Sequence, residues 1–259
     1  MRMELDKGLQ KKAVRYGSLL KAYRTQGGLG IGAVAGGIIL LILGIMLAAF
    51  TALIDSFLGI IIFLVLGVPG LSLCFVGNAK HKKRVDTYID FFQQDTGYSA
   101  QEIQQADQEL MRPDAVKIGS KIDDGRKQVV YIITEHYFLS VWAVKGCYLR
   151  KLDDIVAAFY SNEIPGNGGY RQSLFIITRQ DTKNPGVKNP YTGKQYLGFE
   201  NGMLRMQRDC KNVSLEVIHE MVKRAPHIIT SQYISVKGIK YNLLSMDNWQ
   251  EDWARILEE

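Results

Sequence analysis

Two uncharged stretches near the N-terminus decide the fold: LGIGAVAGGIILLILGIMLAAF at residues 29–50 and FLGIIIFLVLGVPGLSLCFVG at residues 57–77. At about 1.5 Å per helical residue, each can span the roughly 30 Å hydrocarbon core of a bilayer. Six residues separate them, with Asp55 as the one charge, so the connection fits a tight hairpin. The stretches therefore predict two transmembrane helices. Two in tandem disfavour the core helix of a soluble protein, and the 28 residues before the first disfavour a signal peptide.

Basic residues gather beside this hairpin. Residues 1–84 hold 11 Lys and Arg against three Asp and Glu, whereas residues 85–259 hold 21 against 23. The excess of positive charge therefore indicates a membrane surface and not a nucleic-acid partner. Four bases follow the second stretch, and the connecting loop has none: Lys80, Lys82, Lys83 and Arg84. The positive-inside rule predicts a multi-pass protein of the cytoplasmic membrane with both termini in the cytoplasm.

The first stretch carries glycine at intervals of four, at Gly28, Gly32 and Gly36. Small residues on one helical face allow two backbones to approach closely. This face predicts helix packing, either within the hairpin or between copies of the chain. Pro69 and Gly70 predict a bend in the second helix. Neither stretch contains an ionisable acid, base or histidine, so a transport pathway is disfavoured.

The chain divides into five segments by periodicity and composition. They are an amphipathic basic helix (1–27), the hairpin (28–78), helices beyond it (79–114), a β-rich domain (115–226) and a tail (227–259). The first segment, helical over 3–26, either lies on the inner leaflet, packs on another helix or runs into the first span. Ser99 and Glu102 have the spacing of a capping box, which predicts a helix that starts there.

From Val116 the spacing of apolar residues changes from helical to alternating. Short β-branched and aromatic runs predict strands at 116–118, 128–134, 137–144, 147–152, 155–160, 173–178 and 195–199. Apolar residues every four positions then predict a helix over 212–224. The expected fold is α+β: a transmembrane helical hairpin followed by an antiparallel β-sheet or barrel that a C-terminal helix closes.

Two runs add detail to this layout, YIITEHYFL at residues 131–139 and GCYLRKLDDIV at residues 146–156. The pattern resembles bacterial membrane proteins with two transmembrane helices and a cytoplasmic pleckstrin-homology-like domain. The resemblance covers residues 115–226 and implies that fold, without a catalytic signature. Phosphoinositide binding by such a domain needs a basic first loop, and residues 121–127 offset three bases with two acids.

The tail predicts a strand at Tyr233–Val236 and a final helix from Met246. Met246, Trp249, Trp253 and Ile256 share one face of that helix. The face docks on the β-rich domain, on a partner or on the membrane surface. Three distant cysteines lack zinc spacing and are expected to be reduced packing residues: Cys74, Cys147 and Cys210.

No motif predicts catalysis, a cofactor or a metal. His219-Glu220 begins like a zinc helix, but Lys223 stands where the second histidine is needed, and Gly186–Lys194 has the wrong spacing for a phosphate loop. Asp153-Asp154 is typical of a turn. We therefore expect a non-enzymatic, membrane-anchored adaptor that binds a protein partner or itself, with Trp249 and Trp253 as contacts. The alternative is a lipid sensor that uses the four bases after the hairpin.

Overall fold

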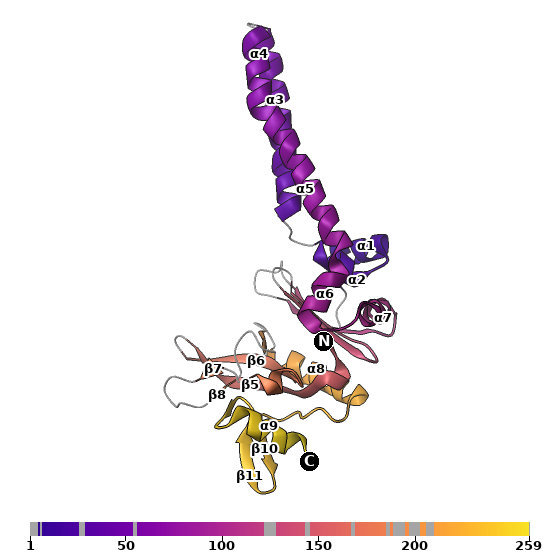
Figure 1. The fold of residues 1–259 in the computed structure, drawn as a ribbon, viewed down its shortest axis with the longest axis vertical. Helices are drawn as coiled ribbons and strands as arrows, with labels where there is room; N and C mark the ends of the chain where they lie inside the picture. Colours follow the sequence, from indigo (N-terminus) through magenta and orange to yellow (C-terminus); the bar gives the residue numbers. More distant parts are fainter. Residues whose placement is uncertain are drawn as a thin grey trace. The chain divides into compact units, whose positions relative to one another are not determined.

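The computed structural model describes residues 5, 7–25, 29–53, 56–121, 128–142, 146–166, 169–184, 187–188, 195–196, 203–205 and 210–258. They form two compact units (Figure 1). The helical unit comprises residues 8–104, and the sheet unit comprises residues 105–259 with the first seven residues. The predicted order is confirmed: two long apolar helices, then antiparallel sheets, then a C-terminal helix.

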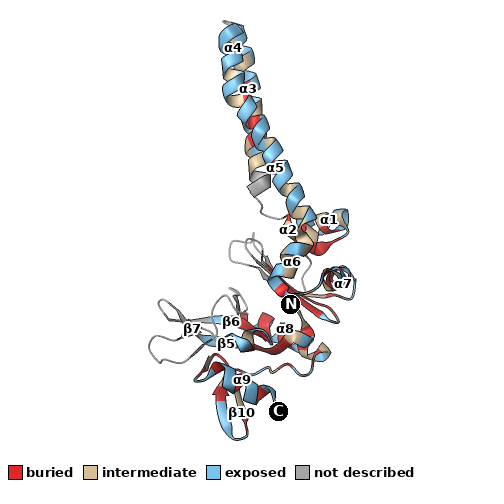
Figure 2. Cartoon of the chain, viewed as in Figure 1, coloured by how far each residue is buried: buried red, intermediate tan, exposed pale blue. Residues whose placement is uncertain are grey.

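The apolar hairpin consists of α3 (Leu29–Ala52) and a returning helix made of α4 (Ser56–Ile62), η1 (Phe63–Gly67) and α5 (Val68–Asp86). Both arms are long and apolar enough to cross a membrane, over Ala33–Ala52 and Ser56–Asp86. Only 11% and 17% of the 18-residue apolar windows within these segments are buried, and Figure 2 shows both arms mostly as exposed. The core helix of a soluble protein would be largely covered, so this burial disfavours that alternative.

A π-helical turn, η1, lies directly before Pro69 in the returning helix. Proline has no N–H to donate to the carbonyl four residues earlier, and its ring crowds that carbonyl. A widened turn relieves this crowding without ending the helix. The predicted distortion at Pro69 thus takes the form of a π-turn in a helix that continues to Asp86.

Glycines bring the two arms of the hairpin into backbone contact. A Cβ atom added to Gly37 would lie 2.6 Å from the Gly70 carbonyl oxygen, and one added to Gly44 would lie 2.8 Å from the Gly67 nitrogen. Any side chain at these positions would force the helices apart. Cys74 packs at the same contact, with its Sγ 3.7 Å from the Val34 carbonyl oxygen. The packing is therefore within the hairpin, as one of the two sequence-based alternatives expected.

The glycines that make this contact are not the predicted ones. A Cβ atom at Gly36 would meet no other atom within 4 Å, so this residue points away from the second arm. Gly32 lies in the first turns of α3, and Gly28 lies outside the described residues. Gly36 therefore does not make the contact within the hairpin, and packing of this face between copies of the chain stays a prediction.

The N-terminal segment forms two helices instead of one, α1 (Lys7–Tyr16) and α2 (Leu19–Arg24). Gly17 separates them in the left-handed region, with φ of 61°. The amide of Ser18 donates to the Ala13 carbonyl oxygen and that of Gly17 to the Val14 carbonyl oxygen, the pattern of a glycine-terminated helix end. The Ser18 hydroxyl then caps α2 by accepting from the Lys21 amide.

Beyond the hairpin, the predicted helices of residues 79–114 are the end of α5, α6 (Tyr88–Thr96) and α7 (Ala100–Leu110). Gly97, with φ of 75°, ends α6. The predicted capping box at the start of α7 is confirmed in both directions. The Ser99 amide donates to Glu102 Oε2 at 2.7 Å, and the Glu102 amide donates to Ser99 Oγ at 3.3 Å.

The sheet unit contains a four-stranded antiparallel sheet and a three-stranded one. The first has the order β1 (Val116–Lys121), β2 (Gln128–Ile133), β3 (Tyr137–Trp142), β4 (Gly146–Lys151). A 3₁₀ turn, η2 (Leu152–Asp154), leads into the second, with the order β5 (Ile155–Gly166), β6 (Gly169–Thr178), β9 (Met203–Arg205). Helix α8 (Cys210–Arg224) contacts β1, β2, β5 and β6. Its residues Val213, Val217 and Met221 join the core that both sheets share.

A second core lies on the opposite face of the β5–β6 pair. The tail supplies β10 (Tyr233–Val236), β11 (Ile239–Asn242), β12 (Ser245–Met246) and α9 (Trp249–Leu257). The small third sheet has the order β10-β11-β12-β8-β7, completed by β8 (Gln195–Tyr196) and β7 (Val187–Lys188). Phe159 and Phe175 stack 5.4 Å apart in this core. The strand predicted at 233–236 is confirmed.

No closed barrel forms among the described residues. Strand β5 pairs with β6 and not with β4, so the four-stranded and three-stranded sheets stay separate. The corner at Leu152–Asp154 redirects the chain between them. Of the two expected forms, a sheet or a barrel, the described residues form open antiparallel sheets, and the resemblance to a pleckstrin-homology-like domain stays a prediction.

Substitution of neighbouring glycines tests the hairpin contact. Gly37→Ala should destabilise the hairpin by about 1–3 kcal/mol, because the new methyl group overlaps the Gly70 carbonyl. Gly36→Ala, the matched control, should change its stability by less than about 0.5 kcal/mol. Unfolding of the purified protein in mixed detergent micelles measures both. Equal effects of the two substitutions would contradict the contact.

The β10–β11 turn offers a stabilising substitution. Lys237 and Gly238 form a two-residue turn in which both φ angles are positive, 49° and 81°. Asparagine tolerates the first position better than lysine, so Lys237→Asn should raise the free energy of unfolding by about 0.5–1 kcal/mol. Lys240→Asn on strand β11 is the control and should not stabilise, because asparagine is a poor strand former. Denaturant unfolding followed by tryptophan fluorescence checks both variants.

Candidate functional site

Helices α1 and α2 are fixed to the end of the hairpin by aromatic and polar contacts. Tyr16 Oη and His81 Nε2 lie 3.2 Å apart, which joins the end of α1 to α5. Helix α2 contacts both α5 and α6. The Arg24 guanidinium lies 3.8 Å from the Phe91 ring centre, a cation–π distance. The N-terminal segment therefore packs on other helices, which was one of its three predicted placements.

The bases predicted to contact the membrane surface lie in the last three turns of α5. Lys80, Lys82 and Lys83 are exposed, whereas Arg84 is half-buried. Helix α1 exposes Lys7, Lys11 and Arg15, and the last two belong to the helical unit. Together these residues give the helical unit a positively charged surface just beyond its apolar hairpin.

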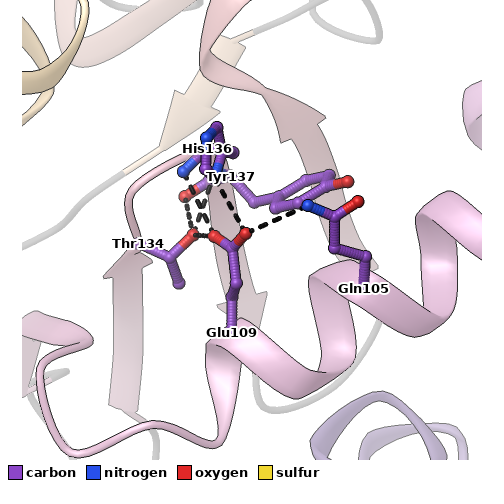
Figure 3. A network of polar contacts seen from close by, with 5 residues as sticks. All are labelled: Gln105, Glu109, Thr134, His136 and Tyr137. Atoms are coloured by element: carbon purple, nitrogen blue, oxygen red, sulfur yellow. Dashed lines mark hydrogen bonds and ion pairs between the residues drawn. The ribbon is translucent and has the colours of Figure 1, made fainter.

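A buried carboxylate organises the turn between β2 and β3 in the sheet unit (Figure 3). Glu109, at the end of α7, is 3% exposed. Its Oε2 accepts from the Thr134 hydroxyl at 2.8 Å and from the His136 amide at 3.2 Å. Its Oε1 lies 2.8 Å from His136 Nδ1 and 3.5 Å from the Gln105 amide nitrogen that donates to it. Four donors thus compensate one buried charge.

Burial raises the pKa of Glu109, but the hydrogen bonds from Thr134 and His136 outweigh it and hold the pKa below its usual value. The carboxylate is therefore ionised at neutral pH. The His136 ring is half-exposed, so its Nδ1 meets the carboxylate while the rest of the ring contacts solvent. This network joins α7 to the β2–β3 turn, and the sequence analysis did not find it.

Trp249 and Trp253 do not form an exposed contact surface, so their interpretation as partner contacts was wrong for this fold. They are 2% and 1% exposed and lie in the core that the tail builds on the β5–β6 pair. Trp249 Nε1 donates to the Asp181 carbonyl oxygen at 3.1 Å, which fixes α9 to η3 (Asp181–Lys183). The alternative in which the terminal helix docks on its own domain is confirmed.

The remaining candidate residues have structural surroundings. His219 is exposed, and Glu220 pairs with Lys223 and Arg224, whose hydrogen bonds lower the pKa of Glu220 to about 2. Asp153 and Asp154 form the η2 turn, where the Arg179 amide donates to the Asp154 carbonyl oxygen. Among the described residues, no group of three or more His, Cys, Asp or Glu side chains could hold a metal. Gly186, Gly193 and Lys194 and most of the loop 121–127 lie outside the described residues.

No family model, curated protein or solved structure matches this chain.

Replacement of the buried carboxylate tests the Glu109 network. Glu109→Gln should lower the free energy of unfolding at pH 7 by about 1–3 kcal/mol, because an amide cannot accept all the bonds that the carboxylate accepts. The wild type should lose this contribution as pH falls from about 4.5 through the lower folded pKa. The variant should lack that part of the pH dependence.

Glu135→Gln is the control, since Glu135 is an exposed carboxylate in the same turn. Denaturant midpoints between pH 3 and pH 8 measure all three proteins. Identical pH profiles for the wild type and Glu109→Gln would contradict a depressed pKa at Glu109.

Proposed function

We propose that this chain is a membrane-anchored interaction module, in which the hairpin is the anchor and the sheet unit presents the binding surface. The apolar outer face of the hairpin carries this proposal. Large side chains cover it, with Ile39 59% exposed, Met46 65% and Phe75 72%. Burial of such surface stabilises by about 25 cal/mol per Å², so water is a poor environment for it and lipid a good one.

The orientation follows from the bases at the two ends of the hairpin. Lys80, Lys82 and Lys83 are exposed after the second arm, and Lys11 and Arg15 are exposed before the first. Bases near membrane spans remain on the cytoplasmic side. We therefore place the hairpin tip outside and both termini in the cytoplasm.

The arrangement of the sheet unit supports a pleckstrin-homology-like domain. Nine described strands precede α8: four in one sheet, three in another (β5, β6 and β9), and β7 and β8, which pair with the tail sheet. Helix α8 packs against strands of the first two sheets and covers the core between them. Antiparallel strands followed by one covering helix are the order that the sequence resemblance implies, although the strand predicted at 195–199 is β8 of the tail sheet and the described strands do not close into a barrel.

The tail supplies the best candidate surface for a protein partner. Strand β10 is the edge strand of its sheet, and the β10–β11 hairpin exposes Tyr233 (56%) and Ile239 (50%). An edge strand offers unpaired backbone groups, and exposed aromatic residues are enriched in protein interfaces. The partner contacts that the sequence predicts at Trp249 and Trp253 thus fit Tyr233 and Ile239 better.

Photo-crosslinking in cells tests the proposal. Benzoylphenylalanine at position 239 should give one adduct of defined mass from the membrane fraction, and overproduced unlabelled protein should compete for it. Position 215 is the matched control, because Leu215 on α8 is also 50% exposed.

An adduct with a second copy of the chain would identify the partner as self. Equal adducts at both positions, or none at either, would contradict a specific surface on β10–β11. A labelled protein that remains outside the membrane fraction would contradict the anchor.

A further inference from the structure

Helix α1 presents a basic face with an exposed apolar residue beside it. Lys11, Val14 and Arg15 lie at helical spacings of three and four and are exposed, Val14 to 72%. The opposite face, with Leu9 and Ala13 at 2% and 3% exposure, is buried in the protein. Packing of α1 on the protein uses Leu9 and Ala13 and does not need the exposed Val14 side chain on the outer face. Bases around an exposed apolar residue are typical of helices that bind the membrane interface.

The contact of Tyr16 with His81 sets the depth of this face. His81 lies four residues beyond Gly77, the last residue of the apolar stretch, which is about 6 Å along a helix. The polar headgroup layer on each side of a bilayer core is about 5–7 Å thick. The end of α1 is therefore held at headgroup depth together with Lys80, and Lys82 and Lys83 follow at and just beyond the outer edge of this layer. Gly17 ends α1 at this level and turns the chain into α2.

These bases are not neutralised within the part of the chain that the structure describes. The ion pairs there involve other residues: His136 with Glu109, Lys223 and Arg224 with Glu220, and Arg255 with Glu251 and Asp252. Five exposed cations near the end of the hairpin attract anions. In the headgroup layer of a bilayer these anions are lipid phosphates.

We infer that Lys11 and Arg15 of α1, together with Lys80, Lys82 and Lys83 of α5, form a binding surface for the headgroups of anionic phospholipids. Val14 inserts between those headgroups. The inference rests on the proposed membrane anchor and adds a lipid class to it. Bases that only determine topology would need no helix fixed beside them, whereas α1, held to α5 at Tyr16, adds Lys11, Arg15 and an exposed apolar residue.

Spin-labelled lipids test the surface in the full-length protein. The protein is reconstituted in phosphatidylcholine bilayers that contain phosphatidylglycerol as a quarter of the lipid. Electron paramagnetic resonance then gives the motionally restricted fraction of spin-labelled phosphatidylglycerol and, separately, of spin-labelled phosphatidylcholine. The ratio of the two association constants should favour the anionic lipid in the wild type.

The double variant Lys11→Gln, Arg15→Gln should lower this ratio by about fivefold for each base that contacts a headgroup. The matched control Lys237→Gln, Lys240→Gln removes two exposed lysines from the β10–β11 hairpin and should leave the ratio unchanged.

The outcomes separate the inference from the proposed function. A ratio near one in the wild type would overturn the lipid surface, and so would a ratio that the α1 variant retains. Restricted signal from both lipids in either case would still support the anchor. No restricted signal from any lipid would overturn the anchor and, with it, the inference.

Discussion

The β5–β6 pair is buried on both faces, and the packing of the whole sheet unit depends on it. Alternate residues along the two strands point to opposite sides, so Ala158, Leu174 and Ile176 join one core while Phe159, Phe175 and Ile177 join the other. Helix α8 covers the first face, and the tail with α9 covers the second. A two-sided apolar pair cannot leave either face in water, because each large side chain gains about 1.5–3 kcal/mol on burial. The tail is therefore a structural layer of the domain. This explains why Trp249 and Trp253 point inward and donate to or pack against their own chain, and why a partner has to use the residues that remain outside.

The hairpin has a different source of order. Its two arms meet through backbone, small and apolar side chains, and in lipid the hydrophobic effect would give them no reason to associate. Close backbone approach replaces that driving force. Gly37 against Gly70 and Gly44 against Gly67 bring the helices near enough for extensive van der Waals contact, and Gly59 does the same against Ala48 nearer the tip. The large side chains are left for the outer face. Small residues thus lie between the two helices and large apolar residues lie on their outer face, the reverse of a helical hairpin in a soluble protein. This arrangement is the physical reason to propose that the hairpin is a membrane anchor.

Local signals in the sequence predicted local structure well. The Ser99–Glu102 capping box and the strand at Tyr233–Val236 depend on neighbouring residues, and both are present. The errors concern partners distant in the chain. Spacing alone could not show which of the adjacent residues Gly36 and Gly37 faces the second arm, because that depends on the rotation of α3 about its axis. The sequence showed the hydrophobic face of α9, but it could not show that the β5–β6 pair covers this face. Glu109 was missed because an isolated glutamate is normally exposed, and its four donors come mainly from a turn 25 residues later. Its only local sign is its place between the buried residues Ala106 and Leu110.

The bases beside the hairpin can direct its insertion into the membrane, and they can also bind lipid headgroups in the folded protein. The structure gives a way to distinguish these two roles. Insertion depends on how many bases flank a span, and it is largely indifferent to their arrangement once the chain has folded. Binding depends on where the charges stand. The Gly17 turn, the contact of Tyr16 with His81 and the contact of Arg24 with Phe91 all fix positions of the N-terminal segment that topology does not require. Fixing those side chains costs conformational entropy, about 1–2 kcal/mol for a long side chain such as arginine. A segment that acts only through its net charge does not need that order, so the order favours the proposed lipid-binding surface over a role in insertion alone.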